Sequence, residues 1–144
     1  MVNDSLVPTH STAASTSTLY RTPGVDEYRQ TSNILPLAFG LVPDDMVASL
    51  VDDIEARDTH LNTGVVGTRE ILPVLTAHGQ IEVAHAVATQ TTYPSWGYWV
   101  DGLGRTSLQE HWEEDTRSLN HHFCGSIGQW MYADLAGITP GEPG

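Results

Sequence analysis

Residues 43–56 read PDDMVASLVDDIEA and decide the fold class. Apolar side chains recur in this stretch every three or four positions, the spacing that places them on one face of an α-helix. These side chains are Met46, Val47, Leu50, Val51 and Ile54. Pro43 suits the first turn of a helix, and the two aspartates that follow it face the positive end of the helix dipole. The stretch therefore predicts an amphipathic helix that opens at Pro43.

Residues 26–39, just upstream, have the same helical period, and Gly40 after them is a common helix stop. Residues 1–20 are rich in Ser and Thr, which bury little apolar surface, so they predict a disordered tail. Residues 140–144 begin with a proline, which cannot continue a helix, and they are expected to form a second tail. The folded domain is therefore expected to span residues 21–139.

Downstream of the deciding stretch, residues 58–67 are polar and contain Gly, which predicts a loop. Thr68 is the expected N-cap of a helix that runs through Leu75, and Pro73 is expected early enough in that helix to be tolerated. Residues 80–90 predict a further helix. Successive helices joined by short connections predict consecutive helical hairpins.

Residues 91–120 differ from the rest because they are aromatic and Gly-rich with little periodicity. A loop of this length in a compact domain is usually either functional or poorly ordered. Short β-strands are expected only near residues 96–100. Residues 121–136 predict a last helix, and its expected buried side chains are Phe123, Ile127, Trp130 and Met131. The predicted fold class is all-α.

The composition excludes several classes of partner. The formal net charge is −12, and all six basic residues are Arg. Such a chain repels phosphate backbones and offers no basic stripe, so no nucleic-acid partner is expected. The sequence also has no apolar run near the ~18 residues that span a membrane, so no membrane partner is expected.

Cysteine and histidine usage bears on compartment and cofactors. A lone Cys124 cannot form an internal disulfide, and the N-terminus lacks the basic start and apolar core of a secretory signal. A cytoplasmic location is therefore expected. His111, His121, His122 and Cys124 are chemically suited to zinc. Their spacing matches no zinc signature, and the adjacent histidines would point to different helix faces, so we expect no metal and no cofactor.

Five segments, in order, carry a resemblance to a known family. They are QTSN at 30–33 with FGLVP at 39–43, HLNTG at 60–64 with GT at 67–68, QTTYPSWGY at 90–98, GRTSLQEHW at 104–112, and SLNHHF at 118–123 with Trp130 and AGI at 136–138. In this order and spacing they resemble the six-hairpin catalytic domain of bacterial α-L-rhamnosidases. The resemblance covers roughly residues 28–138.

This resemblance implies part of an α/α toroid, an incomplete ring of six helical hairpins whose connections line a sugar pocket. It also implies inverting hydrolysis of terminal α-L-rhamnosides, with a rhamnose-containing glycoside as substrate. Glu110 occupies the position of the family's general base, and Asn120-His121 that of a pair that helps to bind the sugar. The chain departs from the family at Gln109, where an aromatic residue is usual.

The resemblance also places the family's general acid well upstream of the matched segments. The chain is therefore expected to be the C-terminal part of a catalytic domain, inactive alone, with a second chain as a candidate to complete the ring. Inverting hydrolysis needs two carboxyl groups on opposite faces of the sugar, ~6.5–9.5 Å apart. A pair formed by Glu110 and Glu114 at helical spacing would not meet this requirement, because neighbours on one helix cannot easily flank a sugar.

Glu110 must be ionised to act as a base, and Arg105 together with a partly open pocket is expected to keep it charged. Trp112 is expected to wall the site. The competing interpretation is that Glu110 belongs to a solvated acidic face that includes Glu113, Glu114 and Asp115.

Other side chains have two interpretations each. Trp96, Tyr98 and Trp99 are expected to form the apolar wall that a 6-deoxy sugar needs, or else to pack in the core. His60 and Asn62 are expected to bind sugar hydroxyls, or else to cap a loop.

Two further functions stay open at this level. The first is a rhamnoside-binding remnant without catalysis. The second is a related toroid hydrolase or lyase that acts on another sugar, such as a uronic acid.

Overall fold

The computed structural model describes residues 7–8, 19–21, 23–24 and 29–141. The helices are α1 (Thr31–Ala38), α2 (Met46–Ala56), α3 (Val65–Ala77), α4 (Ile81–Ala88) and α5 (Ser126–Trp130). Shorter helical turns are η1 (Tyr98–Gly102), η2 (His122–Gly125) and η3 (Met131–Leu135). Two short strands, β1 (Val7–Pro8) and β2 (Tyr20–Arg21), pair antiparallel. The described chain is mostly helical, and the predicted all-α class is confirmed.

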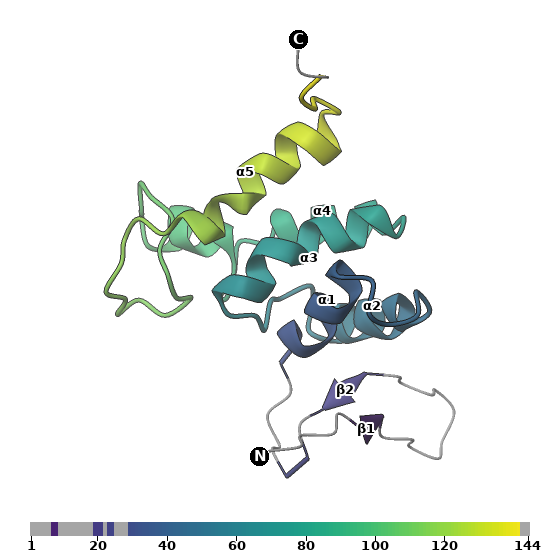
Figure 1. Ribbon diagram of the computed structural model, residues 1–144. Coiled ribbons are helices and arrows are strands. Elements are labelled where there is room, and N and C mark those ends of the chain that lie inside the picture. The colour runs from purple at the N-terminus through teal and green to yellow at the C-terminus, as the bar shows by residue number, and fades with distance from the viewer. Residues whose placement is uncertain (1–6, 9–18, 22, 25–28, 142–144) are drawn as a thin grey trace, which may run out of the picture.

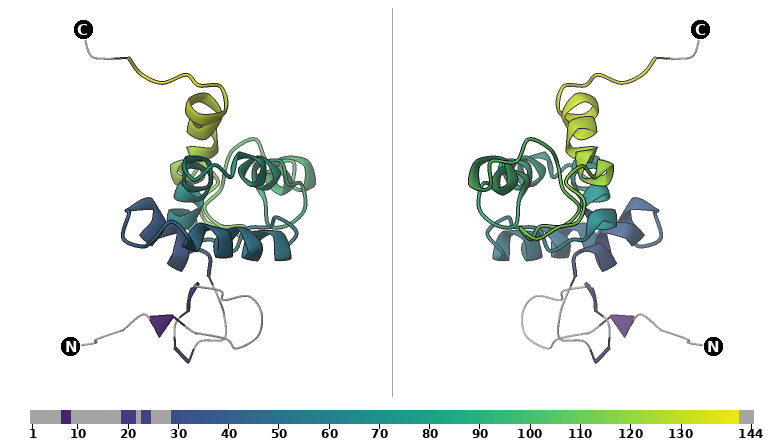
Figure 2. Two further views of the ribbon diagram at one scale, coloured as in Figure 1. Left: turned by 90° about the vertical axis from the view of Figure 1, so that its right-hand side faces the viewer. Right: turned by 90° about the vertical axis from the view of Figure 1, so that its left-hand side faces the viewer.

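The helices are arranged as successive hairpins. Helix α3 packs between α1 and α5, while α2 packs on α1 and α4 on α3 (Figure 1). Helices α1, α3 and α5 thus form one row, and α2 and α4 are their hairpin partners. Two turned views show the same arrangement, with the C-terminal helix projecting from the end of the row (Figure 2). No helix in the described part of the chain is both long and apolar enough for a membrane span.

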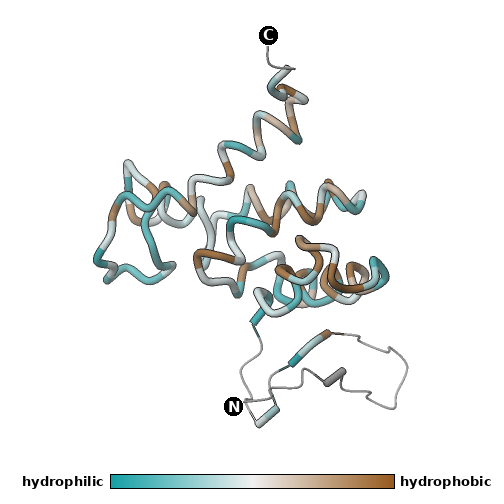
Figure 3. Tube along the Cα trace, viewed as in Figure 1, coloured by the Kyte–Doolittle hydropathy of each residue, from teal (hydrophilic) through white to brown (hydrophobic). Residues whose placement is uncertain are grey.

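The core forms where the apolar faces of these helices meet (Figure 3). Side chains with almost no exposed surface come from α1 through α5; they include Ile34, Leu50, Ile54, Ile71, Leu72, Leu75, Val87 and Trp130. Burying one such aliphatic side chain contributes about 1.5–3 kcal/mol. The predicted stripe of α2 is confirmed: Met46, Val47, Leu50 and Ile54 are buried, and Val51 is partly buried.

The start of α3 differs from the prediction. The helix begins at Val65 rather than after Thr68, and Gly64 is its extended N-cap residue. The Thr68 hydroxyl donates to the Gly64 carbonyl oxygen (2.9 Å) and also bonds the Thr63 hydroxyl (2.7 Å). A threonine inside a helix can bond the carbonyl four residues back, so the residue that looked like a cap lies within the first turn.

Pro73 is likewise not early in α3, which continues past it to Ala77. A proline in a helix interior removes one backbone hydrogen bond and is costly. Its neighbours Leu72 and Val74 are buried, and this tertiary packing offsets the local cost.

The N-terminal boundary is only partly within the described residues. Helix α1 begins at Thr31, and residues 26–28 of the predicted 26–39 helix lie outside the described residues. The predicted stop at Gly40 is confirmed by its left-handed φ of 62°. Most of the expected tail also lies outside the described residues. Leu19 is buried, however, and the backbone N–H of Tyr20 donates to the Asn33 side-chain oxygen (2.7 Å), so the end of that segment packs on α1.

Two C-terminal predictions need correction. Residues 96–100 form no strand; they enter the helical turn η1, where the Tyr98 N–H donates to the Ser95 hydroxyl (3.0 Å). The predicted last helix is present as η2, α5 and η3 in succession, and Ile127 and Trp130 are buried as expected. Phe123 is only partly buried and Met131 is 44% exposed. Met131 follows Trp130 by about 100° around the helix, which turns it away from α3.

Large apolar side chains are exposed at both ends of the helix row. Phe39 and Leu41 follow α1 at one end. At the other end, the exposed apolar side chains are Met131, Tyr132, Leu135 and Ile138. A contiguous exposed apolar patch usually marks a surface that another segment or chain covers, and these side chains are the candidates for such a surface.

Candidate functional site

A cavity of about 400 Å³ lies where the first helices of the hairpins begin. Its helical wall comes from the start of α1, with Arg29 and Thr31, and from the start of α3. The residues at the start of α3 are Thr63, Gly64, Val65 and Thr68. Because helix N-termini carry unpaired N–H groups and a partial positive charge, this end of the row favours anionic groups.

The opposite wall is the loop that contains the candidate base. Glu110, His111, Trp112 and Glu113 line the cavity in succession, together with Cys124 before α5. In Figure 1 this loop is drawn in green, beside the ends at which α3 and α5 begin. The tertiary structure thus brings together four segments that are far apart in the sequence.

Glu110 lies at the cavity rather than in bulk solvent. Its side chain is 31% exposed, and the Nε2 atom of His111 lies 3.9 Å from its Oε1 atom. Burial, and next the negative charge of Glu110, raise the pKa of the Cys124 thiol to about 11. A carboxylate at this position is placed to accept a proton from a water in the cavity.

Arg105 does not form the expected pair with Glu110 among the described residues. Its guanidinium donates to the backbone carbonyl oxygen of Glu114 (3.2 Å), and its backbone N–H donates to that of Trp99 (2.8 Å). Arg105 therefore holds the loop, while Arg29 lines the cavity with Glu110.

The indole rings form a stack with one ring at the cavity. Trp112 lines the cavity, stacks on Trp99 (ring centroids 4.4 Å apart), and meets Trp96 edge-on (5.6 Å). Trp99 is fully buried and Trp96 is 4% exposed, and neither lines this cavity. The Trp112 indole N–H donates to the Thr63 carbonyl oxygen (2.8 Å). The placement of Trp96 and Trp99 thus matches core packing, while Trp112 faces the cavity.

Tyr98 and Glu114 are paired with each other. The Tyr98 hydroxyl donates to a Glu114 carboxylate oxygen (2.9 Å), and this hydrogen bond is the main reason that the Tyr98 pKa is raised. Residues 110–115 form bends rather than a helix, so the helical pairing of Glu110 with Glu114 does not arise.

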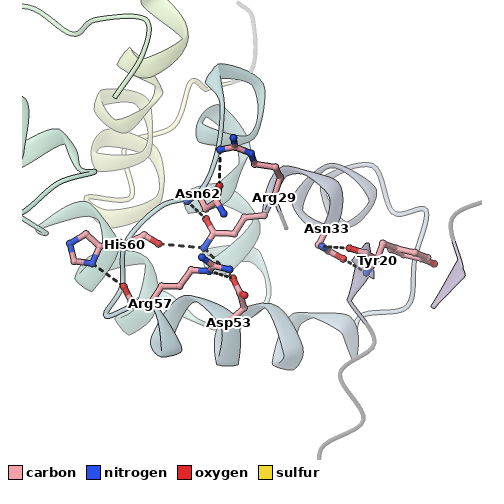
Figure 4. A network of polar contacts seen from close by, with 8 residues as sticks. Tyr20, Arg29, Asn33, Asp53, Arg57, His60 and Asn62 are labelled. Atoms are coloured by element: carbon pink, nitrogen blue, oxygen red, sulfur yellow. Dashed lines mark hydrogen bonds and ion pairs between the residues drawn. The ribbon is translucent and has the colours of Figure 1, made fainter. Parts of the chain in front are cut away.

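His60 and Asn62 take part in a polar network that includes Arg29, a residue of the cavity (Figure 4). The two ring nitrogens of His60 contact the Arg57 carbonyl oxygen (2.9 Å) and the Thr92 hydroxyl (2.7 Å). The Asn62 side-chain oxygen accepts from Arg29 (3.0 Å), which itself lines the cavity. Both residues therefore hold loops, and Asn62 also orients a cavity side chain.

His121 lies beside the loop rather than at this cavity. Its backbone N–H donates to the Leu108 carbonyl oxygen (2.7 Å), and its ring packs near His122 and Phe123. Through this backbone bond it helps to fix the segment that leads to Glu110. In the described part of the chain, no three His, Cys, Asp or Glu side chains gather as a metal site would require.

Several cavity residues were missed by sequence reasoning. Thr63 and Thr68 lie in segments already noted for the family resemblance, so a signal for them existed. The same holds for Thr31, which lies in the QTSN segment at 30–33. Arg29 has no local signal, because only the packing of α1 beside α3 brings it to the cavity. Glu113 was named only in the competing interpretation, as part of a solvated acidic face; it is exposed and also lines the cavity with Glu110.

Comparison with known proteins gives one consistent result. A family model described as the bacterial alpha-L-rhamnosidase 6 hairpin glycosidase domain matches residues 6–135. An alpha-L-rhamnosidase of Streptomyces avermitilis is 42% identical over 129 residues, which are 80% of this chain and 12% of that protein. One from Formosa agariphila is 35% identical over 129 residues, 80% of this chain and 14% of that protein.

Solved structures agree with the sequence relatives. The crystal structure of the Streptomyces avermitilis enzyme complexed with L-rhamnose has a TM-score of 0.68 at 42% identity, over 78% of this chain and 12% of that one. That of the native Aspergillus terreus enzyme has a TM-score of 0.73 at 30% identity, over 81% of this chain and 15% of that one. The chain thus spans a small part of the length of these proteins.

Proposed function

Because this chain belongs to the bacterial α-L-rhamnosidase family of six-hairpin glycosidases, we propose that it supplies the general base and part of the sugar pocket of an α-L-rhamnosidase. The predicted family is confirmed, and so is the predicted fold, part of an α/α six-hairpin toroid. The activity and the substrate are proposals, since the chain spans only 12% of the Streptomyces avermitilis relative.

The observation that carries the proposal is the position of Glu110 at a cavity built on helix N-termini. In inverting hydrolysis, a carboxylate removes a proton from water while the water oxygen attacks the anomeric carbon. The bond to the leaving oxygen breaks on the opposite face, and a carboxylic acid there protonates that oxygen. We assign to Glu110 the role of the carboxylate that removes the proton from this water.

The sugar would lie against Trp112. A 6-deoxy sugar offers C–H faces and a methyl group that pack on an indole ring. A cavity of about 400 Å³ falls within the ~300–1,000 Å³ typical of small-molecule sites. We assign Trp96, Trp99, Tyr98, Arg105, His60, Asn62 and His121 to holding this pocket in shape.

We place the general acid outside these 144 residues. Glu113 also lines the cavity, but it lies on the same loop as Glu110 and so approaches from the same side. The exposed apolar side chains at both ends of the helix row support a further segment or a second chain that completes the ring.

The first experiment measures binding and turnover separately. We expect the chain alone to bind L-rhamnose, seen in NMR titrations, without hydrolysing p-nitrophenyl α-L-rhamnoside. Trp112→Ala should weaken binding. Binding that this change leaves unaltered would contradict the pocket, and turnover by the chain alone would contradict an external acid. Binding that never becomes turnover, even in a completed ring, would identify the rhamnoside-binding remnant.

The second experiment tests the base. Once the segment that completes the ring is supplied, Glu110→Gln should lower kcat by about 10²–10⁴-fold. Glu114→Gln is the matched control, since Glu114 is bonded to Tyr98 outside the cavity. Equal losses in the two variants would rule out Glu110 as the base. Uronic-acid glycosides in the same assay would reveal the alternative sugar class.

A further inference from the structure

Gln109 precedes the proposed base and is completely buried. Its side-chain Nε2 atom donates to two backbone carbonyl oxygens, those of His111 (2.9 Å) and Glu113 (2.8 Å). Both acceptors belong to residues that line the cavity. One side chain therefore ties the two ends of the turn that begins at Glu110.

The backbone on either side of this turn is also tied. The N–H of Glu110 donates to the Ser118 carbonyl oxygen (3.0 Å), and that of His121 donates to the Leu108 carbonyl oxygen (2.7 Å). These two bonds fix where the chain enters the turn. Within residues 111–113, the Trp112 indole N–H donates to the Thr63 carbonyl oxygen (2.8 Å), and the Trp112 carbonyl oxygen accepts from the Trp99 indole (3.4 Å). The Gln109 amide holds the residues on either side of Trp112.

The arrangement has a cost, which argues that the amide matters. The Gln109 Oε1 atom is buried and has no hydrogen-bond partner. A buried acceptor without a donor is destabilising, and an apolar side chain of the same shape would avoid that penalty. The gain that offsets the penalty here is the pair of N–H donors.

We propose that Gln109 is a positioning residue: its buried amide holds the turn of residues 110–113 so that the Glu110 carboxylate points into the cavity. The inference rests on the proposed function only where it calls Glu110 the base. The placement of that carboxylate can be measured whether or not the protein hydrolyses a glycoside.

Cys124 is a reporter for this placement. It is the single cysteine of the chain, it lines the cavity, and the charge of Glu110 contributes to its raised pKa. A carboxylate that leaves the cavity would lower the thiol pKa. With ¹³Cβ-labelled cysteine, one NMR resonance follows this titration.

The test compares Gln109→Met with Asn33→Leu. Methionine keeps the length of glutamine but removes both donors. Asn33 is an equally buried amide that bonds the Tyr20 backbone and lies outside the cavity, so its loss is the matched structural control. We expect both variants to lower Tm. Only Gln109→Met should also lower the Cys124 pKa and weaken L-rhamnose binding by about tenfold, or ~1.4 kcal/mol.

The proposal is overturned if Gln109→Met leaves the Cys124 pKa where the control leaves it. Glu110→Gln must lower the Cys124 pKa, because it removes the charge that the thiol senses. If Trp112→Ala and Gln109→Met both leave L-rhamnose binding unchanged, the proposed sugar pocket is wrong, but the positioning role of Gln109 is not contradicted. Side-chain amide exchange in the unaltered chain keeps the test valid if Gln109→Met does not fold. The Gln109 NH₂ protons should exchange at least tenfold more slowly than those of the exposed Gln129. Equal exchange rates would refute the positioning role of the Gln109 amide.

Discussion

In the hairpins α1–α2 and α3–α4, buried apolar side chains such as Ile34, Leu50 and Ile71 make the contacts between helices. In residues 91–121, Trp96 and Trp99 are also buried, but side-chain donors that bond to backbone carbonyl oxygens are characteristic of this region. The Trp96 indole donates to Cys124 (2.9 Å), and that of Trp112 donates to Thr63 (2.8 Å). The two regions are both ordered, but different interactions order them.

The difference follows from backbone hydrogen bonding. A helix satisfies its own N–H and C=O groups, so its side chains are free to pack. An irregular segment leaves carbonyl oxygens that must find other donors. The indoles, Gln109 and Arg105 supply such donors over residues 91–121. The candidate site lies where these two kinds of structure meet, and its cavity takes one wall from each.

The largest expected effect is in the hairpins. Ile71→Ala removes a fully buried side chain from α3 and should lower the free energy of unfolding by about 2–5 kcal/mol. Urea unfolding followed by circular dichroism measures this loss. Val66→Ala on the same helix is the control, because Val66 is exposed, and it should change stability by less than ~0.5 kcal/mol. Similar losses in both would mean that apolar burial does not hold the hairpins.

A smaller and more local effect is expected from Trp112→Phe. The change keeps an aromatic ring over Trp99 but removes the N–H that serves the Thr63 carbonyl oxygen, at a cost of about 1–3 kcal/mol. Hydrogen exchange should quicken in residues 105–121 while the amides of α2 keep their protection. Uniform loss of protection would show that the loop and the hairpins unfold as one unit.

Thr68→Val tests the junction between the two regions. Valine keeps the shape of threonine but loses the hydroxyl that bonds Thr63 and Gly64, so we expect a loss of about 0.5–1.5 kcal/mol. Thermal unfolding measures it. Thr89→Val is the control because the Thr89 hydroxyl bonds the His85 carbonyl oxygen at an exposed position, and it should leave Tm nearly unchanged.

The smallest effect at neutral pH comes from Cys124. Burial and the charge of Glu110 raise its pKa from 9.0 to about 11. Its thiol therefore ionises first in the unfolded state, and its contribution to stability is complete below pH 9 and is lost as the pH rises toward 11. Between pH 8.5 and 11, the wild-type free energy of unfolding should fall more steeply than that of Cys124→Ala. Parallel curves would contradict the assigned environment.

Local sequence patterns predicted most of the helices but fewer of the residues at the candidate site. The α2 stripe and the stop at Gly40 followed from periodicity and from the conformational freedom of glycine. The start of α3 was misplaced because a threonine within a first turn resembles an N-cap. Met131 was wrongly expected to be buried, since the period of a helix does not say how far its partner extends.

The site divides in the same way. The family resemblance singled out Glu110 and Trp112, and both line the cavity. For Trp99 the sequence left a sugar wall and core packing open, because a sequence does not say which of several neighbouring rings faces outward; the ring is fully buried. Arg29 and Glu113 went unrecognised, since each reaches the cavity only through contacts with distant segments.

By itself, the sequence determined the all-α class and the segments that become helices, because apolar periodicity and turn residues act over a few neighbouring positions. Its motifs, in their order, carried the resemblance to the family. Only the tertiary structure decided which side chains share the cavity and which donors serve the loop. Those choices depend on hydrogen bonds and packing between residues that are far apart in the chain, and no local pattern encodes such distances.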